Sequence, residues 1–246
     1  MDDSLYFDSF RIKASETDVE KRIKIPNLLN CLQEAAWTNA SKHGFSTFDM
    51  LKHGITWVVN RLYIEFFSLP TYPGTISVET WPSGLDKYFA YRDFRVFDEH
   101  DKLLVQATSN WIVLDVKERK MIAVPEHVQE ARFPVDRGGM ERIKSRYTYN
   151  EDKTENEFST NVSWFDLDIN NHVNNTKYSE WVLDALGLEL LQSRTIKSLD
   201  ITFKAESGYG DQINSSCYEE SENTYLHQVK NAVDGKVLVL AKTVVE

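Results

Sequence analysis

Cysteine, basic charge and long apolar runs are all scarce in this sequence, and each shortage excludes a class of protein. Only two cysteines occur, Cys31 and Cys217, and no Cys/His spacing is typical of zinc, so we expect neither a disulfide scaffold nor a structural zinc site. The longest apolar runs, such as Val237–Ala241, are too short to span a membrane. The acidic start, MDDSLYFDSF, lacks the features of a secretory or transit peptide, so we expect a cytoplasmic protein.

The formal charge of −10 at pH 7 argues against a nucleic-acid-binding protein, which normally presents a basic face. The basic residues are nevertheless concentrated. Residues 117–146 contain eight Lys or Arg against five Asp or Glu, a local charge of +3 that leaves −13 for the rest. The densest part holds Arg137, Arg142, Lys144 and Arg146. Two interpretations stay open for it, a solvated linker or a docking surface for an acidic partner.

The sequence repeats itself at an interval of 137 residues. The segment LYIEFFSLPTYPGTI, residues 62–76, aligns without gaps with LDITFKAESGYGDQI, residues 199–213, and five of the fifteen positions are identical. Further on, KLLVQAT (102–108) resembles KVLVLAK (236–242). Because the matching segments occur in the same order, internal duplication is the better interpretation.

Each half also shows the same order of expected elements, a helix and then four strands. Apolar residues at helical spacing predict helices in residues 27–44 and 175–187. Runs rich in Val, Ile, Thr and aromatics predict strands near 57–69, 74–82, 87–98 and 102–116, and again near 197–206, 211–220, 224–234 and 236–245. We therefore expect an α+β fold of two tandem units, each a long helix wrapped by an antiparallel sheet, joined side by side. The expected units are residues 1–130 and 157–246, with 131–156 as a linker.

A polar cluster occupies residues 164–175, WFDLDINNHVNN. Its first carboxylates have the spacing of an EF-hand calcium loop, but the twelfth position, where calcium needs a bidentate glutamate, is Lys177. A transition-metal site would need a partner histidine at a suitable spacing, and the sequence offers none. A polar cap on the following helix, by Asn174 or Asn175, explains part of the cluster.

Acid, amide and imidazole alternate within this cluster at Asp168, Asn170 and His172. In an extended segment alternate residues point the same way, so we expect these three side chains to face one pocket. Backbone amides at the start of the next helix, near residues 172–176, would favour a developing negative charge. These are suitable parts for hydrolysis of an acyl group.

The motif DLDINNHVNNTKY, residues 166–178, is similar to the signature of the acyl–acyl carrier protein (acyl-ACP) thioesterases of type II fatty acid synthesis. Residues 57–84, 111–128 and 201–211 also resemble segments of that family, in the same order. The resemblance implies a bacterial member, similar to the plant fatty acyl-ACP thioesterases, with two hotdog domains in one chain. It implies hydrolysis of the acyl-ACP thioester, which releases free fatty acid and terminates synthesis.

Carried over by position, the catalytic residues of the family fall on Asp168, Asn170, His172 and Glu206. The repeat supports Glu206, because its counterpart in the first half is Leu69 and we expect that half to lack any equivalent of the polar cluster. Residues 1–130 would then shape the acyl pocket and residues 157–246 would be catalytic. Plant members often carry cysteine directly after this glutamate. Here the position is Ser207, so we expect direct attack by water.

The expected mechanism uses no metal and no organic cofactor, because a thioester is already an activated acyl group. Glu206, together with His172, would deprotonate the water, and Asn170 with the helix amides would hold the oxyanion. For Asp168 three roles stay open: it could orient Asn170, raise the basicity of His172, or act as a nucleophile.

The expected partner is acyl carrier protein bearing a phosphopantetheine-linked acyl chain, with the basic residues 137–146 as its docking surface. Formation of a homodimer is left open. Two alternative functions also stay open, a hotdog thioesterase acting on acyl-CoA and a non-catalytic acyl-binding protein. A hotdog dehydratase is disfavoured, because no His-Phe-Pro type segment precedes the helix.

Overall fold

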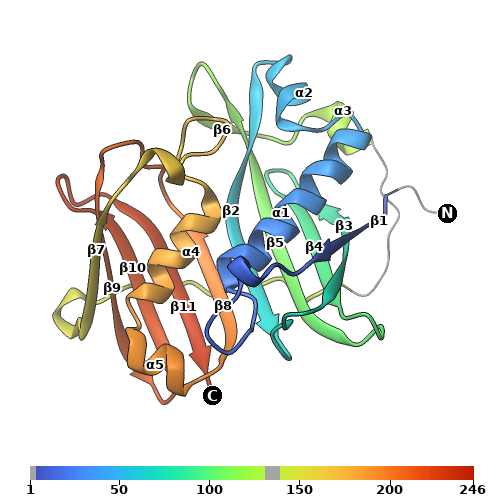
Figure 1. The fold of residues 1–246 in the computed structure, drawn as a ribbon. Helices are drawn as coiled ribbons and strands as arrows, with labels where there is room; N and C mark the ends of the chain where they lie inside the picture. The colour runs from blue at the N-terminus through green and yellow to red at the C-terminus, as the bar shows by residue number, and fades with distance from the viewer. Residues whose placement is uncertain (1–3, 131–138) are drawn as a thin grey trace. The chain divides into compact units, whose positions relative to one another are not determined.

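The structure is a computed structural model that describes residues 4–130 and 139–246. The chain divides into two compact units, Met1–Arg142 (unit 1) and Ile143–Glu246 (unit 2), and each is described by itself. Both are built from antiparallel strands and a helix that lies across them (Figure 1). Among the described residues, no helix is long and apolar enough to cross a membrane.

Unit 1 places its strands in the order β1-β3-β4-β5-β2, with β6 beside β5, and every pairing is antiparallel. The strands are β1 (Tyr6–Arg11), β2 (Ile55–Phe66), β3 (Thr75–Leu85), β4 (Ala90–Phe97), β5 (Leu103–Asp115) and β6 (Lys120–Ile122). The helical elements are η1 (Ala14–Glu16), α1 (Ile25–Lys42), α2 (Thr47–Leu51) and α3 (Glu126–Glu130).

Helix α1 forms because one face is apolar and both ends carry suitable residues. Pro26 stands in its first turn, where no backbone N–H is required, and Gly44 follows its last turn with φ +72°. The apolar face is buried and packs against β3 and the neighbouring strands. Its buried apolar members are Ile25, Leu28, Leu29, Leu32, Ala35 and Ala36. The helix and the inner face of the sheet thus form the core of unit 1.

Unit 2 repeats this arrangement with the strand order β8-β11-β10-β9-β7, again antiparallel throughout. The strands are β7 (Asn156–Asn161), β8 (Ile196–Phe203), β9 (Gln212–Ser221), β10 (Thr224–Asn231) and β11 (Val237–Val245). The helical elements are η2 (Glu151–Lys153), η3 (Trp164–Asp166), α4 (Asn175–Asp184) and α5 (Leu188–Ser193). Helix α4 packs against β9 and β10, with Trp181 and Val182 almost fully buried.

The α+β fold and all eight expected strands are confirmed, with ends that shift by a few residues. One expectation is wrong: in each unit a short strand, β1 or β7, precedes the long helix, so neither half starts with its helix. These two strands lie at the edge of their sheets and are only six residues long. The aromatic residues of β1 lie on both faces, with Phe7 exposed, and β7 has Phe158 as its single apolar residue, so neither shows a clear alternation.

The expected linker, residues 131–156, is only partly described, because residues 131–138 lie outside the described residues. The part that follows packs on the units themselves. In unit 1, the backbone N–H of Met140 donates to Asp93 Oδ2 (3.1 Å). In unit 2, the Tyr147 hydroxyl lies 3.0 Å from the Asp200 carbonyl oxygen, and the Tyr149 ring lies against Tyr218. Residues 139–149 are therefore anchored by specific contacts.

Candidate active site

A tight turn between η3 and α4 holds the polar cluster. The backbone N–H of Asp168 donates to the carbonyl oxygen of His172 (2.8 Å), and Leu167 and Val173 form an isolated β-bridge. Asn171 occupies the left-handed region with φ +61°, which asparagine tolerates better than most residues. The Asp168 carboxylate closes the turn from inside, because Oδ1 accepts the backbone N–H groups of Asn170 (2.8 Å) and His172 (3.3 Å).

This geometry corrects the expected reason why Asp168, Asn170 and His172 meet. We expected an extended segment in which alternate residues point the same way, but the chain turns back on itself. The three residues are brought together by the Asp168 carboxylate, whose second oxygen also lies 3.3 Å from Asn170 Nδ2. A short carboxylate that hydrogen-bonds nearby backbone amides favours a turn over a strand.

Glu206 lies beside this turn, just after the end of β8. Its Oε1 atom is 3.5 Å from Nδ1 of His172, and the two side chains are 41% and 46% exposed. The neighbouring residue fixes this approach, because the Ser207 carbonyl oxygen accepts the N–H of Val173 (3.2 Å). The Ser207 N–H in turn donates to the Tyr178 hydroxyl on α4 (3.0 Å). The structure therefore brings all four expected catalytic residues to one place in unit 2.

The Ser207 hydroxyl is not placed as a nucleophile. It is buried and lies 2.7 Å from the hydroxyl of Tyr178. The cysteines are no better suited, because burial raises the pKa of Cys31 to about 11 and that of Cys217 to about 12. Both thiols therefore stay protonated near neutral pH.

Asp166 and Lys177 form an ion pair next to the turn. The Asp166 carboxylate accepts the N–H (2.7 Å) and hydroxyl (2.8 Å) of Ser163, and Lys177 Nζ lies 3.2 Å from its other oxygen. Burial opposes ionisation of Asp166, but these hydrogen bonds and the lysine outweigh it and lower its pKa. Lys177, whose position in the sequence argued against a calcium loop, thus forms an ion pair with Asp166.

The start of α4 is capped as expected, but its amides are used differently from our expectation. Asn174 Oδ1 accepts the N–H of Thr176 (3.1 Å), which is a side-chain N-cap. The N–H groups of His172, Val173 and Asn174 donate to Asp168, to Ser207 and to Asp166. Four of the amides expected to hold an oxyanion are therefore already paired within the unit. The side-chain amide of Asn170, which is exposed, is the better donor.

Unit 1 contains the same turn, which corrects a second expectation. The N–H of Asp18 donates to the Arg22 carbonyl oxygen (2.8 Å), and Asp18 Oδ1 accepts the N–H groups of Glu20 and Arg22, each at 2.9 Å. Each residue number in this turn is 150 lower than that of the equivalent residue in the unit 2 turn. The first half thus has a backbone equivalent of the cluster, with Arg22 and Glu20 in place of His172 and Asn170.

The chemistry of this second turn is different, because Arg22 is already paired. Its guanidinium lies 2.9 Å from Asp18 and 3.1 Å from Glu20. The N–H of Ile23 donates to Pro70 (2.8 Å), as that of Val173 does to Ser207, so Leu69 is the structural counterpart of Glu206. An ion-paired arginine and a leucine replace the histidine and the glutamate, and unit 1 has no equivalent acid–base pair at this position.

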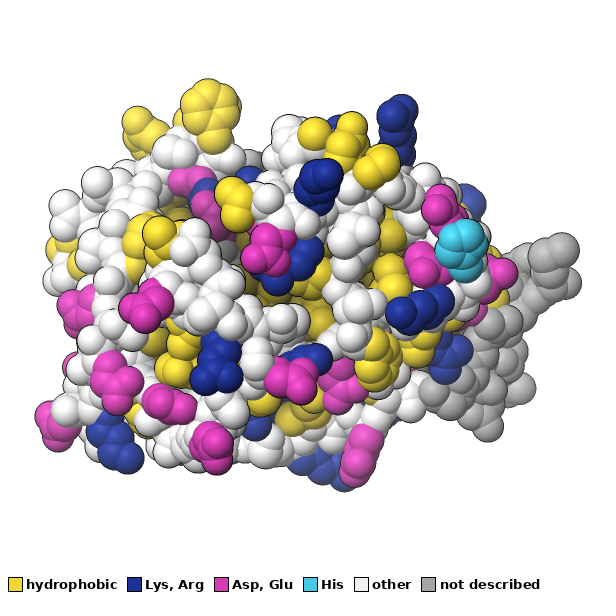
Figure 2. All heavy atoms as spheres, turned by 60° about the horizontal axis from the view of Figure 1, so that its bottom comes forward, with side chains coloured by type: hydrophobic (Ala, Val, Ile, Leu, Met, Phe, Trp, Pro, Cys, Tyr) yellow, Lys and Arg dark blue, Asp and Glu magenta, His cyan; other side chains and the backbone are white. Residues whose placement is uncertain are grey.

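The four residues of the expected docking surface fall into different surroundings. Arg137 lies outside the described residues. Arg142 belongs to unit 1, where its guanidinium lies 3.6 Å from the centre of the Tyr91 ring. Lys144 and Arg146 belong to unit 2 and are exposed. Acidic side chains are spread over the face drawn in Figure 2, with lysines and arginines among them.

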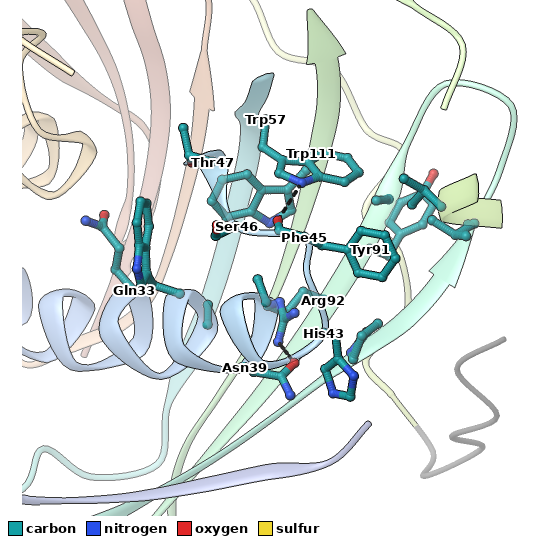
Figure 3. A pocket seen from close by; sticks show the side chains of 17 residues that line it. Gln33, Asn39, His43, Phe45, Ser46, Thr47, Trp57, Tyr91, Arg92 and Trp111 are labelled. Carbon is teal, nitrogen blue, oxygen red and sulfur yellow. Dashed lines mark hydrogen bonds between the residues drawn. The ribbon is translucent and has the colours of Figure 1, made fainter. Parts of the chain in front are cut away.

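A cavity of about 130 Å³ lies inside unit 1, between α1, the segment that follows it and strands β2 to β5 (Figure 3). Its walls are mainly aromatic and aliphatic. The bulky lining side chains are Trp37, Phe45, Trp57, Leu85, Tyr91 and Trp111. Sequence reasoning expected the first half to form an acyl pocket but named no residue of it, because the lining residues come from seven helices and strands and the segment that follows α1.

Comparisons with known proteins were made for the whole chain. The family model "Acyl-ACP thioesterase N-terminal domain" matches residues 3–131, and "Acyl-ACP thioesterase C-terminal domain" matches residues 148–245. A chloroplastic palmitoyl-acyl carrier protein thioesterase from Gossypium hirsutum is 28% identical over 91% of this chain and 57% of its own length. A chloroplastic dodecanoyl-[acyl-carrier-protein] hydrolase from Cinnamomum camphora is 29% identical over 80% of this chain and 55% of its own length. The chain spans little more than half the length of these plant relatives.

Solved structures agree with the family models. The crystal structure of an acyl-ACP thioesterase from Bacteroides thetaiotaomicron superposes with a TM-score of 0.89, at 28% identity over 99% of this chain and 98% of that one. The 12:0-ACP thioesterase from Umbellularia californica has a TM-score of 0.89 at 24% identity, which shows the shared fold. With both family models covering the chain in order, this protein belongs to the acyl-ACP thioesterase family.

Proposed function

We propose that the chain hydrolyses the thioester between a fatty acyl chain and the phosphopantetheine arm of acyl carrier protein, and releases free fatty acid. The observation that supports this most is the approach of His172 Nδ1 to Glu206 Oε1 (3.5 Å), beside a turn that also presents Asn170. The relatives are named for hydrolysis of acyl-ACP, and an imidazole beside a carboxylate is a pair of groups that can carry out the proton transfers of such a reaction.

Glu206 and His172 together activate the attacking water. Both side chains are half exposed, so a water molecule can reach them, and the carboxylate can stabilise the imidazolium that forms when the ring takes a proton. The proton then passes to the departing thiolate of the phosphopantetheine arm. Water adds to the carbonyl carbon, the C–S bond breaks, and the products are a thiol and a carboxylic acid, which loses its remaining proton to solvent at neutral pH.

Asn170 polarises the thioester carbonyl and holds the oxyanion. Its Nδ2 atom has two hydrogens, of which one is directed at Asp168 Oδ2 (3.3 Å) and the other can donate to substrate. Asp168 is a positioning residue in this account. Its carboxylate contacts two backbone amides and the Asn170 side chain, and these contacts favour orientation of Asn170 over a role as nucleophile.

Unit 1 supplies the binding site for the acyl chain. The cavity between α1 and the sheet is apolar, and its volume of about 130 Å³ has room for roughly ten water-sized groups. Unit 2 has the acid–base pair. This division agrees with the replacement of Glu206 by Leu69 in the repeated turn of unit 1. Lys144 and Arg146 are proposed to dock the acidic carrier protein. The cytoplasmic location and the bacterial origin stay predictions.

The test is release of free fatty acid from a panel of acyl-ACP thioesters of different chain length, with the same acyl groups on coenzyme A in parallel. We expect hydrolysis of the carrier-protein thioesters at a higher kcat/KM than that of the CoA thioesters. Preference for CoA would instead support an acyl-CoA thioesterase. Binding of acyl-ACP without release of fatty acid would support a non-catalytic acyl-binding protein.

A further inference from the structure

One charged side chain lines the otherwise apolar cavity of unit 1. Arg92 on β4 extends toward α1 among the aromatic walls, as Figure 3 shows. Arg92 is half-buried and belongs to the residues that line the cavity. Burial lowers the pKa of Arg92 to about 10, so it still carries its charge at neutral pH.

The partners of Arg92 are neutral. Its Nη1 atom donates to Asn39 Oδ1 (2.9 Å) and to the hydroxyl of Thr80 (3.1 Å). Within the part of the chain that the structure describes, neither Nε nor Nη2 has a hydrogen-bonding partner. A guanidinium has five N–H donors, and a buried cation without a counter-charge is costly.

No carboxylate of the described residues lines this cavity. The adjacent Asp93 points to the other face of the strand. There its carboxylate accepts hydrogen bonds from the hydroxyls of Ser83 (2.9 Å) and Thr108 (2.6 Å) and from the N–H of Met140. The only other side chain of the lining that can become cationic is His43. The cavity therefore has positive charge and unused donors, and lacks an anion.

We propose that this cavity binds a free fatty acid, with its carboxylate on Arg92 and its alkyl chain against the indole rings of Trp37, Trp57 and Trp111. A carboxylate matches the planar fork of the guanidinium and supplies the missing charge. A thioester carries no charge, so Arg92 distinguishes the acid from the esterified chain. The inference rests on the proposed function only for the origin of this acid, which is the product of the hydrolysis, and the site retains that product.

The first experiment compares charged and uncharged ligands on the full chain. Binding of saturated fatty acids and of the matching fatty alcohols is measured by calorimetry and by fluorescence, because three of the six tryptophans line the cavity. We expect the acid to bind about tenfold or more tightly than the alcohol of equal length, since a hydrogen-bonded charge adds to the same apolar contact. Equal affinity of acid and alcohol, or no binding of the acid, would overturn the proposal.

The second experiment supplies the counter-charge from within the protein. Asn39→Asp places a carboxylate beside the Arg92 guanidinium with almost no change in volume, and it gives up only the 3.4 Å contact from Asn39 Nδ2 to the Ser4 carbonyl oxygen. We expect this variant to lose the preference for the acid while it still binds the alcohol, and Arg92→Gln to behave likewise. Arg11→Gln is the matched control, because Arg11 is exposed at the end of β1 and its loss changes the net charge equally. It should keep the preference.

If Asn39→Asp keeps a full preference for the acid, the proposal is wrong, whether or not Arg92→Gln folds. The binding measurements are repeated with the Glu206→Gln variant, in which we expect kcat to be lower by about 10²–10⁴-fold. If Glu206→Gln still binds the fatty acid with the same preference, binding at Arg92 does not depend on hydrolysis. The two proposals can therefore fail independently.

Discussion

His172 Nδ1 lies 3.5 Å from Glu206 Oε1, although 33 residues separate them along the chain. Two hydrogen bonds donated by backbone N–H groups hold this approach in place, from Val173 to the Ser207 carbonyl oxygen and from Ser207 to the Tyr178 hydroxyl. The turn that carries His172 is thus fastened both to the end of β8 and to α4. The acid–base pair lies within one unit, on elements that are fixed by the fold of that unit.

The duplicated turn offers a matched pair of variants. Asp168→Ala and Asp18→Ala each remove a carboxylate oxygen that accepts two backbone N–H groups at equivalent positions, so each should lower the free energy of unfolding by about 1–2 kcal/mol. Only Asp168→Ala should also lower kcat, because only that turn orients Asn170 and His172. Urea unfolding and initial rates measure the two effects. An equal loss of kcat in both variants would show that Asp168 acts through stability alone.

Ser207→Ala tests the absence of a covalent serine. The variant removes a buried hydroxyl that lies 2.7 Å from the Tyr178 hydroxyl, so we expect a loss of about 1 kcal/mol in stability. The turnover number should stay within a few-fold of the wild type, because water is the nucleophile. A folded Ser207→Ala protein that had lost hydrolysis altogether would point instead to an acyl-serine intermediate.

The carrier-protein docking surface is tested by charge reversal at Lys144 and Arg146, which are exposed in unit 2. The double variant Lys144→Glu/Arg146→Glu should raise KM for acyl-ACP by roughly tenfold or more at low salt. Its two new carboxylates repel an acidic partner, whereas the lysine and arginine attract it. The difference should shrink as salt is added. Lys236→Glu, an exposed lysine in a turn of the same unit, is the control and should leave KM unchanged. No change in the double variant would exclude this surface.

A buried histidine makes unit 2 sensitive to acid. Burial lowers the pKa of His227 to about 3, and its ring is held 2.8 Å from the Thr243 hydroxyl. The unfolded chain binds a proton near pH 6.5 while the folded protein does not, so stability falls as the pH drops from about 6.5 toward 3.

Between pH 7 and pH 5 this single group should reduce the free energy of unfolding by about 2 kcal/mol. Urea unfolding at the two pH values measures it, with His227→Gln as the variant that lacks the titrating group. His100→Gln is the control, because that side chain is 82% exposed. If His227→Gln retained the full pH dependence, the histidine would not be its cause.

The fold could be predicted from the sequence to a large extent, because its main strands and helices carry regular apolar patterns. Leu28 and Leu32 mark the buried face of α1, and the repeat of residues 62–76 at 199–213 marks the duplicated sheet. The edge strands β1 and β7 were missed, because both are short, the exposed Phe7 interrupts the alternation of β1, and Phe158 is the single apolar residue of β7. Edge strands need less apolar character than central ones, so pattern alone does not find them.

The motif predicted which residues form the candidate site, and their catalytic roles stay predictions; it did not predict their geometry. Asp168, Asn170 and His172 meet in a turn, which depends on hydrogen bonds from the Asp168 carboxylate and on a left-handed Asn171. The turn of unit 1 escaped notice because TDVEKRI and LDINNHV share only the aspartate. Arg92 gave no signal either, since a single arginine in a strand is ordinary until α1 covers it.

The central claim is that His172 and Glu206 act together in hydrolysis of acyl-ACP. The most direct measurement is the rate of free fatty acid release from acyl-ACP by the wild type, by His172→Ala, by Glu206→Gln and by the double variant. Each single variant should lower kcat by about 10²–10⁴-fold, and the double variant should lose little more, because the two groups serve one proton transfer. Near wild-type turnover in both single variants would contradict the account.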